Sequence, residues 1–591
     1  MTYRAPVKDM LFVMQELAGI ANVAQLPGHE DAGIDTAAAV LEECARFNEN
    51  VVAPLNWEGD KNPSSWHDGQ VHTTPGFKQA FRQFAEGGWQ GLQHPVEFGG
   101  QGLPKLIHAA CAEMVNSANL SFALCPLLTD GAIEAILTAG SAEQQAHYLP
   151  KMMAGTWTGS MNLTEPQAGS DLSMVRTRAE PQPDGSHKLF GTKIFITYGE
   201  HDMADNIVHL VLARVAGAPE GVKGISLFIC PKVLADGKRN DVHCVSIEHK
   251  LGIKASPTAV LQYGDHGGAV GYLVGQENRG LEYMFIMMNA ARFGVGVQGI
   301  ALAERAYQKA VQYARDRVQS RPVDGSMHTA APILHHPDVR RMLMTMRAHT
   351  EGCRAMALVA AAAYDAAHAH PDVELRQQNQ RFYEFMVPLV KGLSTEMSLE
   401  VASLGVQVHG GMGFIEETGA AQHLRDAKIL AIYEGTTAIQ ANDLVGRKTV
   451  RDGGAVARAI AAQIEATEGQ LATRTSAACH TMARRLAAGR RAFLDVVDFV
   501  TGQSKAEPNA VFAGSVPYLM LAGTVVAGWQ MARALIAAED RLAAGDDTAF
   551  MQAKIATARF YGDHILNKAA ALRDSVVEGA DAVTALALES F

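Results

Sequence analysis

The hydrophobic pattern of this 591-residue chain changes twice, and the changes limit the folds that it can adopt. From about residue 35 to 150, apolar residues recur three and four positions apart, as in amphipathic helices. Between about 156 and 278, short β-prone runs such as KLFGTKIFIT and NIVHLVLARV alternate with turn clusters such as PQPDGS. Helical spacing returns near 279 and continues to the end. An α+β fold with separate helical and β regions is therefore predicted.

These changes also define the expected domains, because a chain of this length is too long for one core. We expect an N-terminal extension at 1–34, a helical domain at 35–155, a β domain at 156–278, a helical domain at 279–450 and an additional helical domain at 451–591. The sequence has no repeat of fixed period and no low-complexity linker.

Charge and cysteine content exclude several classes of protein. The net charge is −11, which argues against a duplex-binding surface. Seven scattered cysteines without a CxxC pair predict neither a disulfide framework nor a zinc cluster, so no metal site is expected. Near the N-terminus, Gln15 and Glu16 interrupt the apolar run at 10–14. Export is therefore not expected, and the cytoplasm is the predicted location.

The stretch at 510–532 carries no charge and is long enough to cross a bilayer. Its richness in Ala and Gly, rather than Leu and Ile, favours a buried helix starting near Pro517. A transmembrane span and a membrane-contacting or interhelical face remain the alternatives.

The stretch GVGVQG at 294–299 has the G-x-G-x-x-G spacing of a dinucleotide-binding loop. That motif requires a preceding strand and an acidic residue about twenty positions on. Here a helical, Met-rich stretch precedes it, and Arg317 and Gln319 stand where the acid belongs. We interpret the glycines as positions of close helix packing.

The segment AIYEGTTAIQ at 431–440 places Glu434 after apolar residues and before Gly435. A buried carboxylate is costly to ionise, so Glu434 is either a paired structural group or a base. Arg425 and Lys428 are its candidate structural partners.

Three polar, glycine-containing segments stand out from simple packing sequence: MNLTEPQAGSD at 161–171, GTKIFITYGEHD at 191–202 and QVHGGMGFIEETGAAQHLRDAKILAIYEGTTAIQ at 407–440. Paired glycines let backbone amides approach a phosphate or ring, and hydroxyls supply orienting hydrogen bonds. Together they suggest a large anionic cofactor.

In their order and spacing these segments resemble the acyl-CoA dehydrogenase family of flavoproteins, over roughly residues 35–450. The resemblance implies a helical N-terminal domain, a central β-barrel-like domain and a C-terminal helical bundle, here with an extra helical tail. It implies FAD as cofactor and the conversion of an acyl-CoA thioester to a trans-2-enoyl-CoA. Glu434 would remove the α-proton, and flavin N5 would accept the β-hydrogen as hydride.

The family's motifs carry over to individual residues. The resemblance assigns FAD contacts to Met161, Leu163, Thr164, Ser170, Phe195, Thr197, Arg317, Gln407, Gly410, Gly411 and Thr436, and substrate contacts to Ser170, Asn289, Arg292 and Gly435. Phe195 replaces the more usual Trp, and Asn289 replaces a common Asp. Ala291 occupies the position where some relatives place their catalytic Glu, so Glu434 has no rival. A solvated helix charge is the alternative for Arg317.

The N-terminal extension and the tail resemble a larger bacterial subgroup that includes 3-methylthiopropionyl-CoA dehydrogenases. That resemblance implies a homodimer. Arg317 would hold the FAD pyrophosphate across a subunit contact, and Gln407, Gly410 and Gly411 would supply the complementary contact from the other protomer. It also implies that an electron-transferring flavoprotein accepts the electrons. An acyl-CoA oxidase and a non-enzymatic DNA-binding relative are the alternatives, although the tail's balanced charge opposes the latter. Medium- or long-chain acyl-CoAs are alternative substrates.

Overall fold

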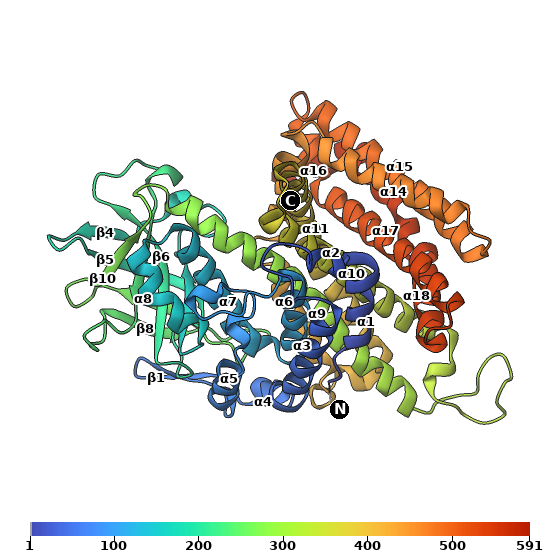
Figure 1. Ribbon diagram of the computed structural model, residues 1–591, viewed down its shortest axis with the longest axis horizontal. Helices are drawn as coiled ribbons and strands as arrows, with labels where there is room; N and C mark the ends of the chain where they lie inside the picture. The colour runs from blue at the N-terminus through green and yellow to red at the C-terminus, as the bar shows by residue number, and fades with distance from the viewer. Residues whose placement is uncertain (1–2) are drawn as a thin grey trace.

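The computed structural model describes residues 3–591 and shows the helical, β and helical regions that the sequence pattern predicts (Figure 1). The N-terminal extension forms α1 (Val7–Val13) and α2 (Ile20–Val23). The first helical region contains α3 (Ile34–Phe47), α4 (Leu55–Lys61), α5 (Phe77–Glu86), α6 (Lys105–Ala118), α7 (Leu120–Ala139) and α8 (Ala142–Met153). Helices α6 and α7 are almost entirely buried.

The first helical region also contains one short β-hairpin that the sequence analysis did not predict. Strands β1 (Ser65–His67) and β2 (Gln70–His72) form a hairpin whose turn residues, Asp68 and Gly69, have φ angles of 49° and 81°. Asp-Gly is a strong signal for such a turn, because both positions require positive φ. The Trp66 indole donates to the Cys244 carbonyl at 2.9 Å, so the hairpin docks on the β domain.

The β domain has strands β3 (Trp157–Asn162), β4 (Arg178–Pro181), β5 (His187–Thr197), β6 (Asn206–Val215), β7 (Ser226–Pro231), β8 (Val242–Ile247), β9 (Thr258–Tyr263) and β10 (Ala269–Val274). The strands pair in the order β10-β7-β6-β4-β5, and β10 pairs with β5 again. This second pairing closes a ring of five strands, which confirms the barrel-like prediction. Strands β9 and β8 extend the sheet from β5, and β3 lies parallel to β6.

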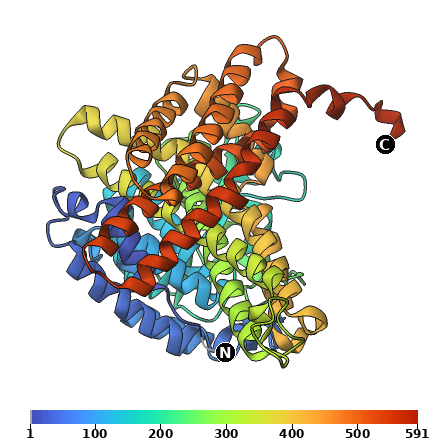
Figure 2. The same cartoon turned by 90° about the vertical axis from the view of Figure 1, so that its right-hand side faces the viewer.

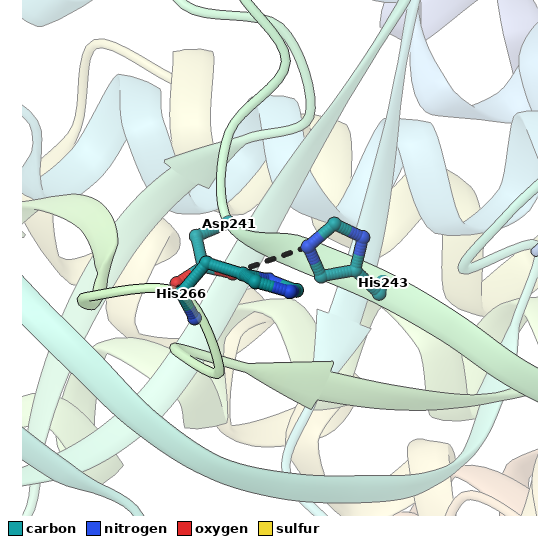
Figure 3. Close-up of side chains that lie close together, drawn as sticks. All are labelled: Asp241, His243 and His266. Atoms are coloured by element: carbon teal, nitrogen blue, oxygen red, sulfur yellow. Dashed lines mark hydrogen bonds and ion pairs between the residues drawn. The ribbon is translucent and has the colours of Figure 1, made fainter.

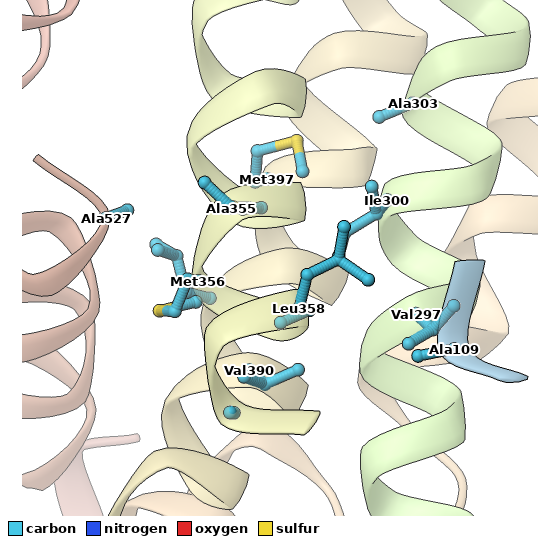
Figure 4. Packing of buried hydrophobic residues seen from close by; sticks show 14 of the residues in the cluster. Ala109, Val297, Ile300, Ala303, Ala355, Met356, Leu358, Val390, Met397 and Ala527 are labelled. Atoms are coloured by element: carbon cyan, nitrogen blue, oxygen red, sulfur yellow. The ribbon is translucent and has the colours of Figure 1, made fainter. Parts of the chain in front are cut away.

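The second helical region contains α9 (Gly280–Asp316), α10 (Pro337–Ala369), α11 (Val373–Val408), α12 (Ala420–Lys428) and α13 (Thr437–Val445). The GVGVQG motif lies inside α9, so no strand precedes it. A Cβ atom on Gly296 would lie 2.6 Å from Val390, and one on Gly299 would lie 2.4 Å from the Ser394 carbonyl. The glycines thus allow α9 to approach α11, as predicted, and side chains such as Ile300 and Met397 fill the adjoining core (Figure 4).

The tail forms α14 (Ala455–Ala472), α15 (Ala477–Gln503), α16 (Pro508–Ala513), α17 (Ser515–Ala543), α18 (Thr548–His564), α19 (Ala569–Val577) and α20 (Ala580–Thr584). Its helices pack along one side of the second helical region (Figures 1 and 2). By length and composition, α7, α9 and α17 could each cross a membrane. The most apolar window of α17 is 83% buried, which confirms the buried-helix interpretation of 510–532.

A buried charge cluster fastens the N-terminal extension to the rest of the chain. Arg354 of α10 is 1% exposed and donates to Asp9 at 2.8 Å, to Glu113 at 3.0 Å and to Glu304 at 2.7 Å. Lys554 of α18 also binds Asp9. One cluster therefore joins α1, α6, α9, α10 and the tail.

Candidate active site

Glu434 lies on a short turn between Ala431 and the start of α13. Both Glu434 and Gly435 have left-handed backbones, with φ angles of 54° and 87°. A left-handed conformation costs a non-glycine residue roughly 1–2 kcal/mol, so the surrounding contacts must hold Glu434 in place. The Thr436 hydroxyl accepts a hydrogen bond from the Ile439 amide at 3.2 Å and caps α13.

The structure argues against the structural alternative for Glu434. Arg425 pairs instead with Asp60 at 2.7 Å and with Glu416 at 2.8 Å, and Lys428 is exposed. Within residues 3–591, the Glu434 carboxylate has no hydrogen-bond or ion-pair partner. Burial raises its pKa, although the charges of Arg292 and Lys391 oppose the rise. A half-buried carboxylate without a partner and with a raised pKa has the properties of a general base.

Lys391 of α11 is a residue that the sequence analysis missed. Its ammonium group donates to the Leu430 carbonyl at 2.8 Å and to the Gly435 carbonyl at 2.7 Å. It therefore holds the turn on both sides of Glu434. The side chain is fully buried, and burial lowers its pKa to about 8. The available signal was a lone lysine inside the apolar run from Val387 to Leu393.

We predict that Lys391→Met slows flavin reduction and moves the acid limb of its pH profile to higher pH. Because the Lys391 charge lowers the pKa of Glu434, its removal raises that pKa, and a higher pH is then needed to ionise the base. Each carbonyl left without a donor also costs about 1–3 kcal/mol of stability.

Stopped-flow measurements from pH 6 to 9 test this prediction, with the exposed Lys428→Met as the matched control. A slower Lys391→Met enzyme whose pH profile is unshifted would show that Lys391 has no electrostatic influence on Glu434.

Tyr433 has a second support that the sequence did not reveal. Its hydroxyl donates to the Gln298 side chain of α9 at 2.5 Å, and Gln298 donates to Asn116 of α6 at 3.0 Å. The residue before Glu434 is thereby tied to two further helices.

The predicted substrate residues lie on α9. Arg292 is 5% exposed and donates to Asn289 at 3.3 Å. Ala291 is also buried and offers no competing carboxylate. Arg292 Nε and both amide atoms of Gln440 are buried and have no hydrogen-bond partner among residues 3–591. Such groups are expected to bind a ligand, because leaving them unpaired is costly.

A cavity of about 520 Å³ begins beside Asn289 and Asp443 and extends between α6, α7, α9 and α11. Aromatic and aliphatic residues line much of it: Phe47, Phe84, Trp89, Leu127 and Phe293. Lys105, His108, Asp130 and Glu134 line a polar part. Cavities of this size and composition hold small molecules.

Phe195 sits at a β-bulge, where the pairing between β5 and β9 shifts between Lys193 and Ile196. Its φ angle is 59°, and the residue is 59% exposed although its neighbour Ile196 is buried. A bulge can re-aim a side chain in this way. Thr197, the last residue of β5, follows the bulge and is half-buried.

The end of β3 lies beside this bulge. The Ile194 amide donates to the Thr164 carbonyl at 2.9 Å, and buried Lys193 donates to the Leu163 carbonyl at 2.9 Å. Lys193 also pairs with Glu165 at 2.8 Å, which fixes the start of the following loop.

The residues of the first two motifs that were predicted to contact FAD therefore lie in one region. Met161 is buried, Leu163 and Thr164 are half-buried, and Ser170 is exposed on the loop.

The segment 249–261, taken as structural, joins the β domain to the helix before the catalytic turn. The Ile253 amide donates to Asp426 of α12 at 2.6 Å, and the Tyr198 amide donates to the Pro257 carbonyl at 2.8 Å. The end of β5 is thus linked through this segment to α12.

The residues predicted to contact FAD at positions 317 and 407–411 are exposed near the ends of α9 and α11. Tyr313 stacks on His409 with ring centroids 4.3 Å apart, and Arg317 follows Tyr313 by one helical turn. Gln407, Gly410 and Gly411 are also exposed, and the space around both glycines is open for 4 Å. One protomer therefore brings together Arg317 and the segment 407–411.

Comparison with known proteins identifies the family. Four models match: "Acyl-CoA dehydrogenase, N-terminal domain" at 35–156, "Acyl-CoA dehydrogenase, middle domain" at 160–266, "Acyl-CoA dehydrogenase, C-terminal domain" at 278–448 and "Acetyl-CoA dehydrogenase C-terminal like" at 457–587. A 3-methylmercaptopropionyl-CoA dehydrogenase of Ruegeria pomeroyi is 54% identical over 593 residues, covering 100% of both chains. The chain belongs to the acyl-CoA dehydrogenase family. It is therefore an oxidoreductase that dehydrogenates acyl-CoA thioesters.

Other relatives agree with this assignment. A broad-specificity linear acyl-CoA dehydrogenase of Mycobacterium tuberculosis is 36% identical, covering 98% of each chain. An acyl-CoA dehydrogenase from Bacillus anthracis, solved in complex with FAD, has a TM-score of 0.75 at 22% identity, covering 97% of this chain and 93% of that one. The latter likeness shows the shared fold.

FAD is the cofactor of this dehydrogenase family, and the residues present fit it. The exposed Phe195 ring offers an apolar surface beside hydroxyl-bearing Thr197, as a flavin ring requires. The buried donors on Arg292 and Gln440, which have no partner among residues 3–591, could bind polar ligand atoms. The open backbone at Gly410 and Gly411 would admit a phosphate group.

Proposed function

We propose that Glu434 is the base that removes the α-proton of the acyl-CoA substrate. The observation that carries this proposal is its half-buried carboxylate, which has no hydrogen-bond or ion-pair partner among residues 3–591 and lies on a strained turn. Within residues 3–591 the Glu434 amide has no hydrogen-bond acceptor, so it is free to polarise the thioester carbonyl. FAD, held beside Phe195 and Thr197, would supply the acceptor for the β-hydrogen as hydride, and the product would be a trans-2-enoyl-CoA.

The chain's own groups prepare this proton transfer. Lys391 holds the turn, and Gln298 holds Tyr433. The positive charges of Arg292 and Lys391 oppose the rise that burial causes in the pKa of Glu434. We assign Met161, Leu163, Thr164, Phe195 and Thr197 to the flavin face. Ser170, Asn289 and Arg292 would face the substrate.

We propose 3-methylmercaptopropionyl-CoA as the substrate, because the full-length relative with 54% identity carries that name. Linear fatty acyl-CoAs are the second candidate class. The relative from Mycobacterium tuberculosis supports them, as does a cavity of about 520 Å³ with mostly apolar walls.

Anaerobic bleaching of the flavin by a panel of acyl-CoAs separates these substrates. We expect fastest bleaching by 3-methylmercaptopropionyl-CoA, whereas faster bleaching by octanoyl- or palmitoyl-CoA would favour the second class. No bleaching by any thioester, with FAD bound, would contradict the proposed activity. Rapid peroxide formation in air would instead indicate an oxidase.

We further propose a homodimer and electron transfer to an electron-transferring flavoprotein. Met412, Phe414 and Ile415 are exposed apolar residues beside Gly410 and Gly411, and Phe414 is 87% exposed. Such a patch favours a protein interface that would place Arg317 and 407–411 against a second protomer. The cytoplasmic location remains a prediction.

A further inference from the structure

Asp241, His243 and His266 come together on the β domain although the sequence showed no metal-ligand spacing (Figure 3). Asp241 immediately precedes β8, His243 lies within it, and His266 lies in the turn between β9 and β10. We propose that these residues form a binding site for a divalent transition metal ion such as Zn²⁺. The earlier expectation of no metal site rested on cysteine spacing, which does not report on such a cluster.

The spacing of the donor atoms suits one small ion. Asp241 Oδ1 lies 3.1 Å from His243 Nε2 and 3.2 Å from His266 Nδ1, and the three ligand atoms lie within 4.8 Å of one another. Metal–ligand bonds of about 2.0–2.2 Å place neighbouring ligands roughly 3.0–3.5 Å apart in tetrahedral or octahedral geometry. The ion would replace the hydrogen bonds within the cluster, with each imidazole presenting its lone pair after a change of tautomer.

The supporting contacts already fix the carboxylate. Asp241 Oδ2 accepts hydrogen bonds from the amides of His266 at 2.7 Å and Gly268 at 3.0 Å, so Oδ1 is directed toward the two imidazoles. Buried Asn240 accepts from the amides of Asp241 and Val270 at 2.9 and 2.8 Å. Ligands held by such outer hydrogen bonds bind metals more tightly.

The types of ligand indicate which ion would bind. Two imidazoles and one carboxylate favour Zn²⁺, Co²⁺ or Ni²⁺ over Mg²⁺ and Ca²⁺, which prefer oxygen ligands alone. The His266 side chain is 76% exposed and that of His243 39%, so ions can reach the cluster and water can complete the coordination.

The cluster is separate from the flavin-binding region. Along β9, Thr258 pairs with Thr197, whereas Tyr263 pairs with Val242 next to Asp241. The five intervening steps correspond to roughly 17 Å of strand. We therefore expect metal binding to fasten the β9–β10 turn to β8 without changing the rate of dehydrogenation.

Calorimetric titration of tag-free, chelator-treated holoenzyme with Zn²⁺ tests the proposal. We expect one site per chain that is lost, or weakened at least about tenfold, in His266→Gln and in Asp241→Asn. His480→Gln removes an exposed imidazole on α15 and serves as the matched control, with binding unchanged. Mg²⁺ should give no binding heat. Equal Zn²⁺ binding by all variants, or none by the wild-type protein, would overturn the proposal.

Discussion

Glu434→Gln should slow anaerobic flavin reduction by an acyl-CoA by about 10²–10⁴-fold, the usual contribution of a general base. Glutamine keeps the size of the side chain but cannot accept the α-proton. Because Glu434 has no hydrogen-bond partner within residues 3–591, the substitution breaks no contact of the turn. The variant should therefore retain FAD and its thermal stability.

Stopped-flow absorbance at the flavin band measures this rate. Glu465→Gln, an exposed substitution on α14, is the matched control and should reduce its flavin at the wild-type rate. Wild-type kinetics in Glu434→Gln would refute its assignment as the base.

Arg354→Met should lower the free energy of unfolding by about 3–5 kcal/mol, the cost of removing one partner from a buried ion pair. The change leaves Asp9, Glu113 and Glu304 in the core without their shared cation. Urea denaturation followed by circular dichroism measures the loss. The exposed pair of Arg458 and Asp498 supplies the control, because Arg458→Met should leave the unfolding midpoint unchanged.

The same cluster predicts an acid sensitivity. Burial alone would raise the pKa of Asp9, but the charges of Lys554 and Arg354 lower it to about 2 from its usual 3.8. The resulting stabilisation is complete above about pH 4 and is lost as the pH falls toward 2.

An unfolding midpoint of Arg354→Met equal to that of the wild-type protein at neutral pH would show that the cluster adds no stability.

The periodicity of the sequence predicted the regions of the fold, because helices and strands repeat their apolar positions differently. It did not predict the β1–β2 hairpin, whose strands of three residues are too short to show alternation. It also could not pair Asp9 with Arg354, since 345 positions separate them and only the fold brings them together.

Prediction of the site had a similar limit. Glu434, Gly410 and Gly411 stand in motifs with a fixed local order, so a linear reading finds them. Lys391 donates to the carbonyls of Leu430 and Gly435, which lie 39 and 44 positions away in the sequence. Every residue type has a backbone carbonyl, so the sequence does not mark these two as acceptors. Roles that depend on such contacts emerge only from the folded chain.

The most direct test of the account is exchange of the substrate α-hydrogens with solvent. Anaerobic holoenzyme in D₂O should incorporate deuterium at the α-carbon of a bound acyl-CoA that cannot transfer its β-hydrogen, and mass spectrometry would detect it. The account predicts exchange with the wild-type enzyme and none above background with Glu434→Gln. Equal exchange in both would mean that another group removes the proton.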